Sequence, residues 1–344
     1  MIKAGYIVHS ELKNTTDEDA RKLDVINIAF AHCRNARFFF EHEEDLAGLG
    51  RLRRANPALR ILFSVGGWGS GGFSTMAASR EGRERFAASC LDAVKRYRLD
   101  GIDIDWEYPG LDWAGIDASP DDKVNFTLLL AAMRERFDRY DKNLMLTAAV
   151  GCDRYFLENT EMEKAAPLLD YVSVMTYDMR GCQDRITGHH TNLFAPDKPD
   201  LFRSYRSVDY SVRLYHEGGV PLDKLVIGLA FYSRMWEDVS SQEENGLWQM
   251  SGPGNYGPSF GLLADRYINQ NGFIRYWDDR CQAPYLFDGR TLISYDDEQS
   301  IAAKCRYAAE KGLRGLMYWE HSCDPGRRLL DALFRCVPDP AALS

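Results

Sequence analysis

A chain of 344 residues, 45% hydrophobic and 27% charged, has the composition of a soluble globular protein and suffices for one large barrel or two ordinary domains. Its formal net charge of −9 argues against nucleic acid or anionic membrane as the main partner, because both are bound through basic patches. No run approaches the roughly 18–20 apolar residues of a membrane span. A neutral or cationic ligand fits this charge better.

The N-terminal segment MIKAGYIVHS contains neither a long apolar stretch nor a small-residue cleavage site. We therefore expect no signal peptide and a cytoplasmic protein, whereas a leader removed before this numbering would make the protein a secreted one. The cysteines form no C-x-x-C pair, so metal-site spacing is absent and reduced, mostly buried thiols are expected. They are Cys33, Cys90, Cys152, Cys182, Cys281, Cys305, Cys323 and Cys336.

Short apolar runs rich in β-branched residues alternate with helical patterns along the chain. Each run is nearly continuous, as in parallel strands covered on both faces. In chain order the runs are residues 2–8, 25–31, 60–67, 99–106, 144–150, 169–177, 225–232 and 313–320. The segment 119–140 illustrates the helices between them, with Ser119 as the expected N-cap and Pro120 at the first helical position.

Eight β/α repeats in one chain predict the α/β class and a closed (β/α)₈ TIM barrel. A doubly wound open sheet is the competing fold, but no G-x-G-x-x-G follows the first strand. The interval between the seventh and eighth strands is too long for one crossover helix. We therefore predict a small α+β insertion at 233–292, followed by a helix at 297–311, and a catalytic barrel formed by 1–232 and 293–344.

The fourth strand contains four carboxylates in the stretch DGIDIDWEYPG: Asp100, Asp103, Asp105 and Glu107. Because side chains alternate along a strand, the last three share one side, and Glu107 lies nearest the carboxyl end, where barrel active sites form. Crowded carboxylates in a site of low polarity retain a proton near neutral pH, as a general acid must. Glu107 is the expected donor, and the spacing assigns no role to Asp100.

Three other interpretations of this strand stay open at this point. It could be a solvated acidic edge, although the intervening residues are bulky and apolar. It could bind a hard cation such as Mg²⁺ or Ca²⁺, which prefers oxygen ligands of this kind. It could also be a purely structural buried network, at a considerable cost in desolvation.

DGIDIDWE matches the D-x-x-D-x-D-x-E signature of family 18 glycoside hydrolases, the chitinase family. Four further segments resemble that family's motifs on its third, sixth, seventh and eighth strands, in the same order and over essentially the whole chain. They are FSVGGW (63–68), MTYDMRG (175–181), GLAFYSRMW (228–236) and GLMYWEHSCD (315–324).

The resemblance implies hydrolysis of β-1,4 bonds next to N-acetylglucosamine with retention of configuration, the substrate's own acetamide being the nucleophile. Glu107 would protonate the glycosidic oxygen and later activate water. Asp105 would hydrogen-bond the acetamide N–H, with Asp103 behind it as charge partner. Tyr177 would donate its hydroxyl to the acetamide oxygen, and Asp178 would orient and polarise the sugar. The resemblance implies no metal and no organic cofactor.

Aromatic residues near the strand ends suit the flat faces of sugars. Trp319 resembles the family's floor under the distorted sugar, and Trp68 follows the Gly66–Gly67 pair where an acceptor-side platform is often found. The other expected substrate-binding residues are Tyr108, Met175, Tyr232 and Arg234, the last preceded by Ser233 where the family often has glycine. Trp113, Trp236, Trp248 and Trp277 are further candidates for the cleft.

Two further groups of residues are expected to have no catalytic role. Ser64, Gly66 and Gly67 should be structural, the glycines permitting close backbone approach or positive φ near the barrel mouth. His189 and His190, in the segment GHHTNLFAP, are expected to face solvent, as paired histidines on a loop usually do.

Three functions remain in competition: a chitinase-type hydrolase, a non-catalytic chitin-binding lectin on the same barrel, and a metal-dependent barrel hydrolase. The intact Glu107, Asp105 and Tyr177 favour the first, and the seven histidines do not supply a convincing ligand set for the third. Chitin, chito-oligosaccharides or another N-acetylglucosamine-containing glycan is the expected partner. The expected assembly is a monomer.

Overall fold

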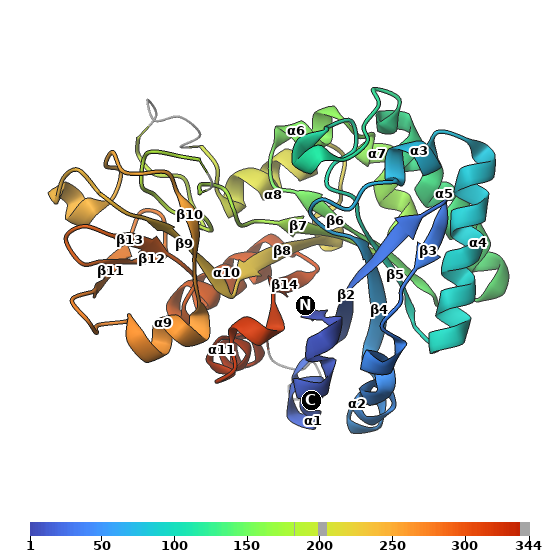
Figure 1. The fold of residues 1–344 in the computed structure, drawn as a ribbon, viewed down its shortest axis with the longest axis horizontal. Coiled ribbons are helices and arrows are strands. Elements are labelled where there is room, and N and C mark those ends of the chain that lie inside the picture. The colour runs from blue at the N-terminus through green and yellow to red at the C-terminus, as the bar shows by residue number, and fades with distance from the viewer. Residues whose placement is uncertain (182, 199–204, 338–344) are drawn as a thin grey trace.

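Eight parallel strands close on themselves into a barrel in this computed structural model, which describes residues 1–181, 183–198 and 205–337 (Figure 1). Around the barrel, each strand is hydrogen-bonded to the next, and the last strand pairs with the first. The strands, in spatial order, are β1 (Ile2–Val8), β2 (Val25–Arg34), β4 (Arg60–Gly66), β5 (Gly101–Asp105), β6 (Met145–Gly151), β7 (Tyr171–Met175), β8 (Leu225–Ala230) and β14 (Gly315–Trp319). The predicted (β/α)₈ barrel is confirmed.

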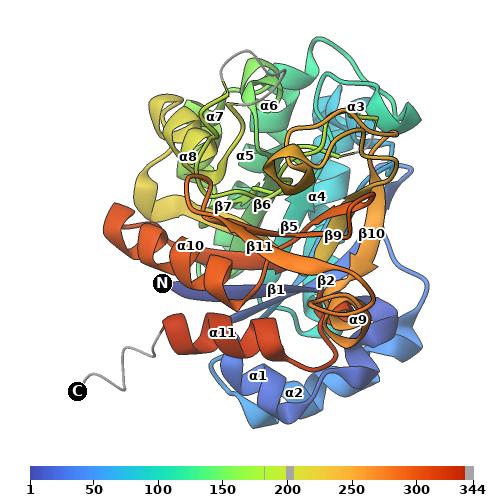
Figure 2. The same cartoon turned by 90° about the vertical axis from the view of Figure 1, so that its left-hand side faces the viewer.

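Helices cover the outside of this barrel, and a short strand, β3 (Arg37–Phe39), extends β2 as an antiparallel hairpin. Figure 2 shows the two last helices close to the N-terminal strand β1. The helices outside the 232–294 segment are α1 (Asp17–Lys22), α2 (Leu49–Ala55), α3 (Phe73–Ala77), α4 (Arg80–Tyr97), α5 (Asp122–Tyr140), α6 (Arg154–Glu158), α7 (Met162–Ala165), α8 (Val208–Glu217), α10 (Glu298–Lys311) and α11 (Arg328–Cys336).

The barrel strands are buried on both faces, which explains their nearly continuous apolar sequences. On β5, Ile102 and Ile104 belong to the large core between strands and helices, together with Trp106 just beyond the strand. Trp106 stacks on Phe73 of α3 with ring centroids 5.3 Å apart. The intervening Asp103 and Asp105 therefore point into the barrel.

Between β8 and α10 the chain forms a five-stranded antiparallel sheet, at the left of Figure 1. Its own core consists of Trp236, Leu247, Tyr285, Phe287 and Leu292. In spatial order its strands are β10 (Asn255–Ser259), β9 (Tyr232–Trp236), β13 (Leu292–Ser294), β12 (Ala283–Phe287) and β11 (Ile274–Asp278), and it includes helix α9 (Phe260–Arg266). The division into a barrel and an insertion domain stays a prediction.

A buried ion pair connects this segment with the barrel. The ammonium of Lys304 on α10 lies 2.7 Å from the carboxylate of Asp296, and both side chains are almost fully buried. Asp296 also accepts the backbone N–H of Ala230 at 3.0 Å and the hydroxyl of Thr191 at 3.2 Å. One carboxylate thus joins the end of β8, the loop after β7 and α10.

Several expected element boundaries differ in the structure, and two of these differences have a clear local cause. Helix α5 begins at Asp122 rather than at Pro120, because the Asp122 carboxylate accepts the backbone N–H groups of Ser119 and Gly110 and makes 119–121 a turn. Strand β7 ends at Met175 rather than at 177, because the N–H of Tyr177 turns back to the carbonyl of Met175 at 2.8 Å.

The cysteines that the structure describes are free thiols, four of them buried. Cys182 lies outside the described residues. Over the described ranges, no helix combines the length and the apolar composition that crossing a membrane requires.

Candidate active site

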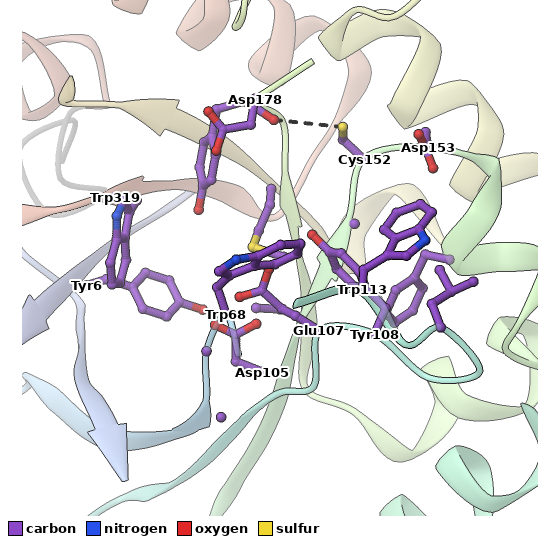
Figure 3. Close-up of a pocket in the computed structure, with 18 of the residues that line it drawn as sticks. Tyr6, Trp68, Asp105, Glu107, Tyr108, Trp113, Cys152, Asp153, Asp178 and Trp319 are labelled. Carbon is purple, nitrogen blue, oxygen red and sulfur yellow. Dashed lines mark hydrogen bonds between the residues drawn. The ribbon is translucent and has the colours of Figure 1, made fainter. Parts of the chain in front are cut away.

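A pocket of about 530 Å³ opens at the carboxyl ends of the barrel strands. Residues from β1, β2, β4, β5, β6, β7 and β14 line it, together with Tyr232, Arg234 and Tyr256 from the antiparallel sheet. Figure 3 shows the carboxyl groups of Asp105 and Glu107 in the middle of this pocket, with Trp319 on one side and Trp113 on the other. All the predicted catalytic and substrate-binding residues except Asp103 line it.

Asp103 lies beneath the pocket, with its side chain fully buried inside the barrel. In register it pairs with Ser64 on β4 and Thr147 on β6, so these side chains share one layer of the interior. Ser64 donates its hydroxyl to Asp103 at 2.8 Å, Thr147 at 2.6 Å, and Tyr6 of β1 at 3.0 Å. Burial raises the pKa of Asp103, although these three donors favour its ionised form.

Asp105 is 4% exposed, and no described side chain or backbone group hydrogen-bonds its Oδ1 atom. Burial raises the pKa of Asp105 well above its usual range, and the charges of Glu107 and Asp103 raise it further. Its backbone carbonyl accepts the N–H of Gly67 at 2.9 Å. A Cβ at Gly66, where φ is +128°, would meet that carbonyl oxygen at 1.9 Å, so the structural role expected for these glycines is confirmed.

Glu107 follows the end of β5 and is half-buried in the pocket wall. Burial raises the pKa of Glu107 to about 7; a hydrogen bond with Tyr108 lowers it, and the charge of Asp178 raises it. Near neutral pH the carboxyl groups of Asp105 and Glu107 therefore hold at least one proton between them. A carboxylic acid with a pKa close to ambient pH can both donate and accept a proton, which general acid–base catalysis requires.

Asp178 and Tyr177 follow β7 on the opposite side of the pocket. Burial raises the pKa of Asp178, but the neighbouring His190 and the hydrogen-bonded guanidinium of Arg234 more than offset it, so that pKa falls well below its usual range. The Arg234 Nε atom lies 2.7 Å from Asp178 Oδ1. Asp178 is thus a permanent negative charge at the pocket wall. Burial raises the pKa of Tyr177 well above its usual range, so its hydroxyl stays a donor.

Aromatic rings surround the carboxyl groups. The Trp319 ring stacks on Phe30 with centroids 5.3 Å apart and an interplanar angle of 22°. Trp68 is 62% exposed and lies edge-on to Tyr108 at 6.2 Å. Of the additional tryptophan candidates only Trp113 lines this pocket; Trp236 lies in the core of the antiparallel sheet, and Trp248 and Trp277 are not among the lining residues.

The expectation that His189 and His190 face solvent is wrong. They are 2% and 0% exposed. His190 lies 3.6 Å from Asp178 through its Nδ1 atom, and its backbone N–H donates to Ser294 Oγ at 3.0 Å. Residues 187–193 of the loop after β7 are buried between the barrel and the antiparallel sheet, which the sequence around these histidines does not indicate.

Several pocket residues were not singled out from the sequence. Tyr6 could have been found, because it has the inward parity of β1, whereas Phe30 and Tyr256 have no local signal. Asp100, whose role the spacing left open, accepts from Arg53 at 2.7 Å and from the backbone N–H of Ile61 at 2.8 Å, at the end of β5 away from the pocket. Its role is structural.

Fold and pocket together define a barrel protein of the glycoside hydrolase class. The chain belongs to glycosyl hydrolases family 18, whose family model matches residues 3–324.

Individual relatives agree with this assignment. Chitinase A1 of Niallia circulans is 38% identical over 323 residues, which cover 86% of this chain and 46% of that protein. The chain thus spans less than half the length of this relative. Chitotriosidase-1 of Mus musculus is 31% identical over 324 residues, covering 88% of this chain and 67% of that protein.

A solved structure shows the same fold over its full length. It is described as a novel glycoside hydrolase family 18 N-acetylglucosaminidase from Paenibacillus barengoltzii. Its TM-score to this chain is 0.94 at 52% identity, and the match covers 98% of this chain and 99% of that one.

Proposed function

We propose that this chain hydrolyses the β-1,4 bonds of N-acetylglucosamine oligomers or polymers with retention of configuration, through an oxazolinium intermediate. One observation supports this most: Glu107, with a pKa of about 7, lies beside Asp105 in a pocket that also contains the aromatic ring of Trp319. This arrangement offers a proton, a polar partner for an acetamide and a flat surface for a sugar.

In the first step, the protonated Glu107 transfers its proton to the glycosidic oxygen. The acetamide oxygen of the same sugar attacks its anomeric carbon, the glycosidic bond breaks, and the leaving sugar departs with the proton. Asp105 accepts a hydrogen bond from the acetamide N–H and balances the positive charge of the oxazolinium ring. Tyr177 donates its hydroxyl to the acetamide oxygen before attack.

In the second step, the Glu107 carboxylate takes a proton from water, and the water oxygen attacks the anomeric carbon. The acetamide is restored, the configuration is retained, and Glu107 is protonated again for the next cycle. Asp178, kept ionised by Arg234, orients the sugar hydroxyl groups and raises the pKa of Glu107.

Hydrolysis of a chromogenic di-N-acetylchitobioside by the wild type and by Glu107→Gln tests this proposal. We expect kcat to fall at least about 100-fold in the variant, since general acid catalysis contributes 10²–10⁴. EDTA at 25 °C should leave turnover unchanged. Binding of chito-oligosaccharides without cleavage would instead indicate a lectin, and loss of turnover with EDTA would indicate a metal-dependent hydrolase.

A second candidate is release of single N-acetylglucosamine units, favoured by the 52% identity to a protein described as an N-acetylglucosaminidase. Product analysis on a tetrasaccharide separates the two activities. Monosaccharide from the earliest time points would favour the second candidate, and disaccharide would favour a chitinase.

A further inference from the structure

Away from the pocket, three side chains of different chemistry meet where the loop after β7 touches the antiparallel sheet. They are His189 in that loop, Asp278 at the end of β11, and Cys281 in the turn to β12. One ligand atom from each, an imidazole nitrogen, a carboxylate oxygen and the thiol sulfur, lies within 4.8 Å of the others. Strands β11 and β12, whose connecting turn contains Cys281, are at the left of Figure 1.

The cluster is enclosed but reachable. His189 is 2% exposed and Cys281 is fully buried, whereas 14% of the Asp278 side chain is exposed. His189 Nε2 lies 3.1 Å from Asp278 Oδ2, and the backbone N–H of Cys281 donates to Asp278 Oδ1 at 3.0 Å. The three side chains therefore face one another across a space that reaches solvent on the side of Asp278.

Only one of the two ring nitrogens of His189 has a hydrogen-bond partner among the described residues. Its ring stands between Trp248 and Tyr285, with centroids 5.5 and 5.8 Å away. Its Nδ1 atom is buried and has no hydrogen-bond partner among the described residues. The other ring nitrogen, Nε2, faces Asp278, so it is the atom that an ion shared with Asp278 and Cys281 would contact.

We propose that His189, Asp278 and Cys281 bind one Zn²⁺ ion, with water as its fourth ligand on the side of Asp278. Zinc in proteins is bound by histidine nitrogen, carboxylate oxygen and cysteine sulfur, and three protein ligands with one water form a common zinc site. The thiol proton leaves to the buffer when the sulfur binds. The thiolate and carboxylate then carry two negative charges, which the ion neutralises, and a neutral assembly is what a buried site favours.

The ion would fasten the loop after β7 to the antiparallel sheet. The next residue, His190, lies 3.6 Å from Asp178 at the pocket wall, so the fastened loop is one that supports the pocket. This role is structural, and the proposal does not depend on the proposed function.

The test uses the full chain, treated with a chelator, dialysed and titrated with Zn²⁺ and, separately, Co²⁺. We expect one equivalent of either ion to bind and the cobalt form to show a near-ultraviolet thiolate-to-cobalt charge-transfer band. Cys281→Ser should abolish the band and weaken Zn²⁺ binding more than about 100-fold, because losing even an outer partner of a metal ligand costs 10–100-fold. At a free Zn²⁺ concentration 100 times Kd, the wild-type Tm should rise by about 4 °C.

Two further variants make the result specific. Asp278→Asn keeps an acceptor for His189 but removes a charge, and it should weaken binding while the protein stays folded. Cys90→Ala removes another buried thiol, on α4, and should change neither the stoichiometry nor the band. Absence of binding by the wild type, or binding and a band that persist in Cys281→Ser, would overturn the proposal and leave a metal-free hydrogen-bonded cluster. Whether or not the ion binds, turnover at 25 °C is expected to be the same, so this test is independent of the proposed function.

Discussion

Glu107→Gln should stabilise the protein more at pH 8 than at pH 5, a prediction that needs no substrate. Burial raises the pKa of Glu107 from 4.5 to about 7. Because the folded-state pKa lies above the unfolded value, the wild type is penalised as the pH rises through that window: the unfolded carboxyl ionises freely, while the folded one resists. A glutamine does not titrate, so the variant escapes this penalty.

The two pKa values set the size of the effect. Between values of 4.5 and about 7, the penalty is about 0.8 kcal/mol at pH 5 and about 3.3 kcal/mol at pH 8, a difference of about 2.5 kcal/mol. For 344 residues the unfolding entropy is about 0.7 kcal/mol per degree, so the variant should gain about 3.5 °C in Tm over the wild type between the two pH values. Easier ionisation of Asp105 in the variant acts in the same direction.

Differential scanning calorimetry at pH 5 and pH 8 measures this difference. Any change in packing caused by the glutamine is common to both pH values and cancels. Glu310→Gln, at an exposed position of α10, is the matched control and should show no such difference. Equal Tm changes at both pH values for Glu107→Gln would refute the raised pKa of Glu107 and, with it, the reason for naming this residue the acid.

Three other substitutions test neighbouring parts of the structure. Asp178→Asn removes a charge that raises the pKa of Glu107, so the basic limb of the kcat profile should move to lower pH; an unmoved limb contradicts the coupling. Trp68→Ala removes an exposed ring and should raise KM for chito-oligosaccharides about tenfold, which corresponds to 1.4 kcal/mol, while kcat stays within about twofold. Initial-rate measurements in which kcat falls and KM does not change would contradict a binding role for Trp68. Lys304→Met leaves the buried carboxylate of Asp296 without its counterion, at a cost of about 3–5 kcal/mol and about 4–7 °C in Tm by calorimetry. A loss below 1 kcal/mol would mean that water reaches the carboxylate.

The features that follow from local pattern were predictable from the sequence. Alternation along β5 separates Asp103 and Asp105 from Ile102 and Ile104 without any knowledge of the fold. Strands buried on both faces have continuous apolar sequences, so the eight barrel strands stand out. Their ends are less predictable, because a backbone turn such as the one at Tyr177 depends on hydrogen bonds rather than on residue type.

Contacts between distant segments were not predictable in the same way. The burial of His189 and His190 depends on an antiparallel sheet that begins more than 40 residues later in the chain. The pairing of Arg234 with Asp178 likewise joins residues 56 positions apart in the chain. Such contacts are fixed by how the elements pack, which a single sequence does not display.

The pairing of the first barrel strand with the last has a consequence for how the protein folds. Tyr6 on β1 holds Asp103, and Trp319 stands at the end of β14, so the pocket contains pieces from both ends of the chain. A nascent chain still missing β14 has no complete pocket, however well its earlier strands have formed. If the proposed function is right, sugar binding should therefore appear only once the barrel has closed, so that binding affinity would report the last step of folding.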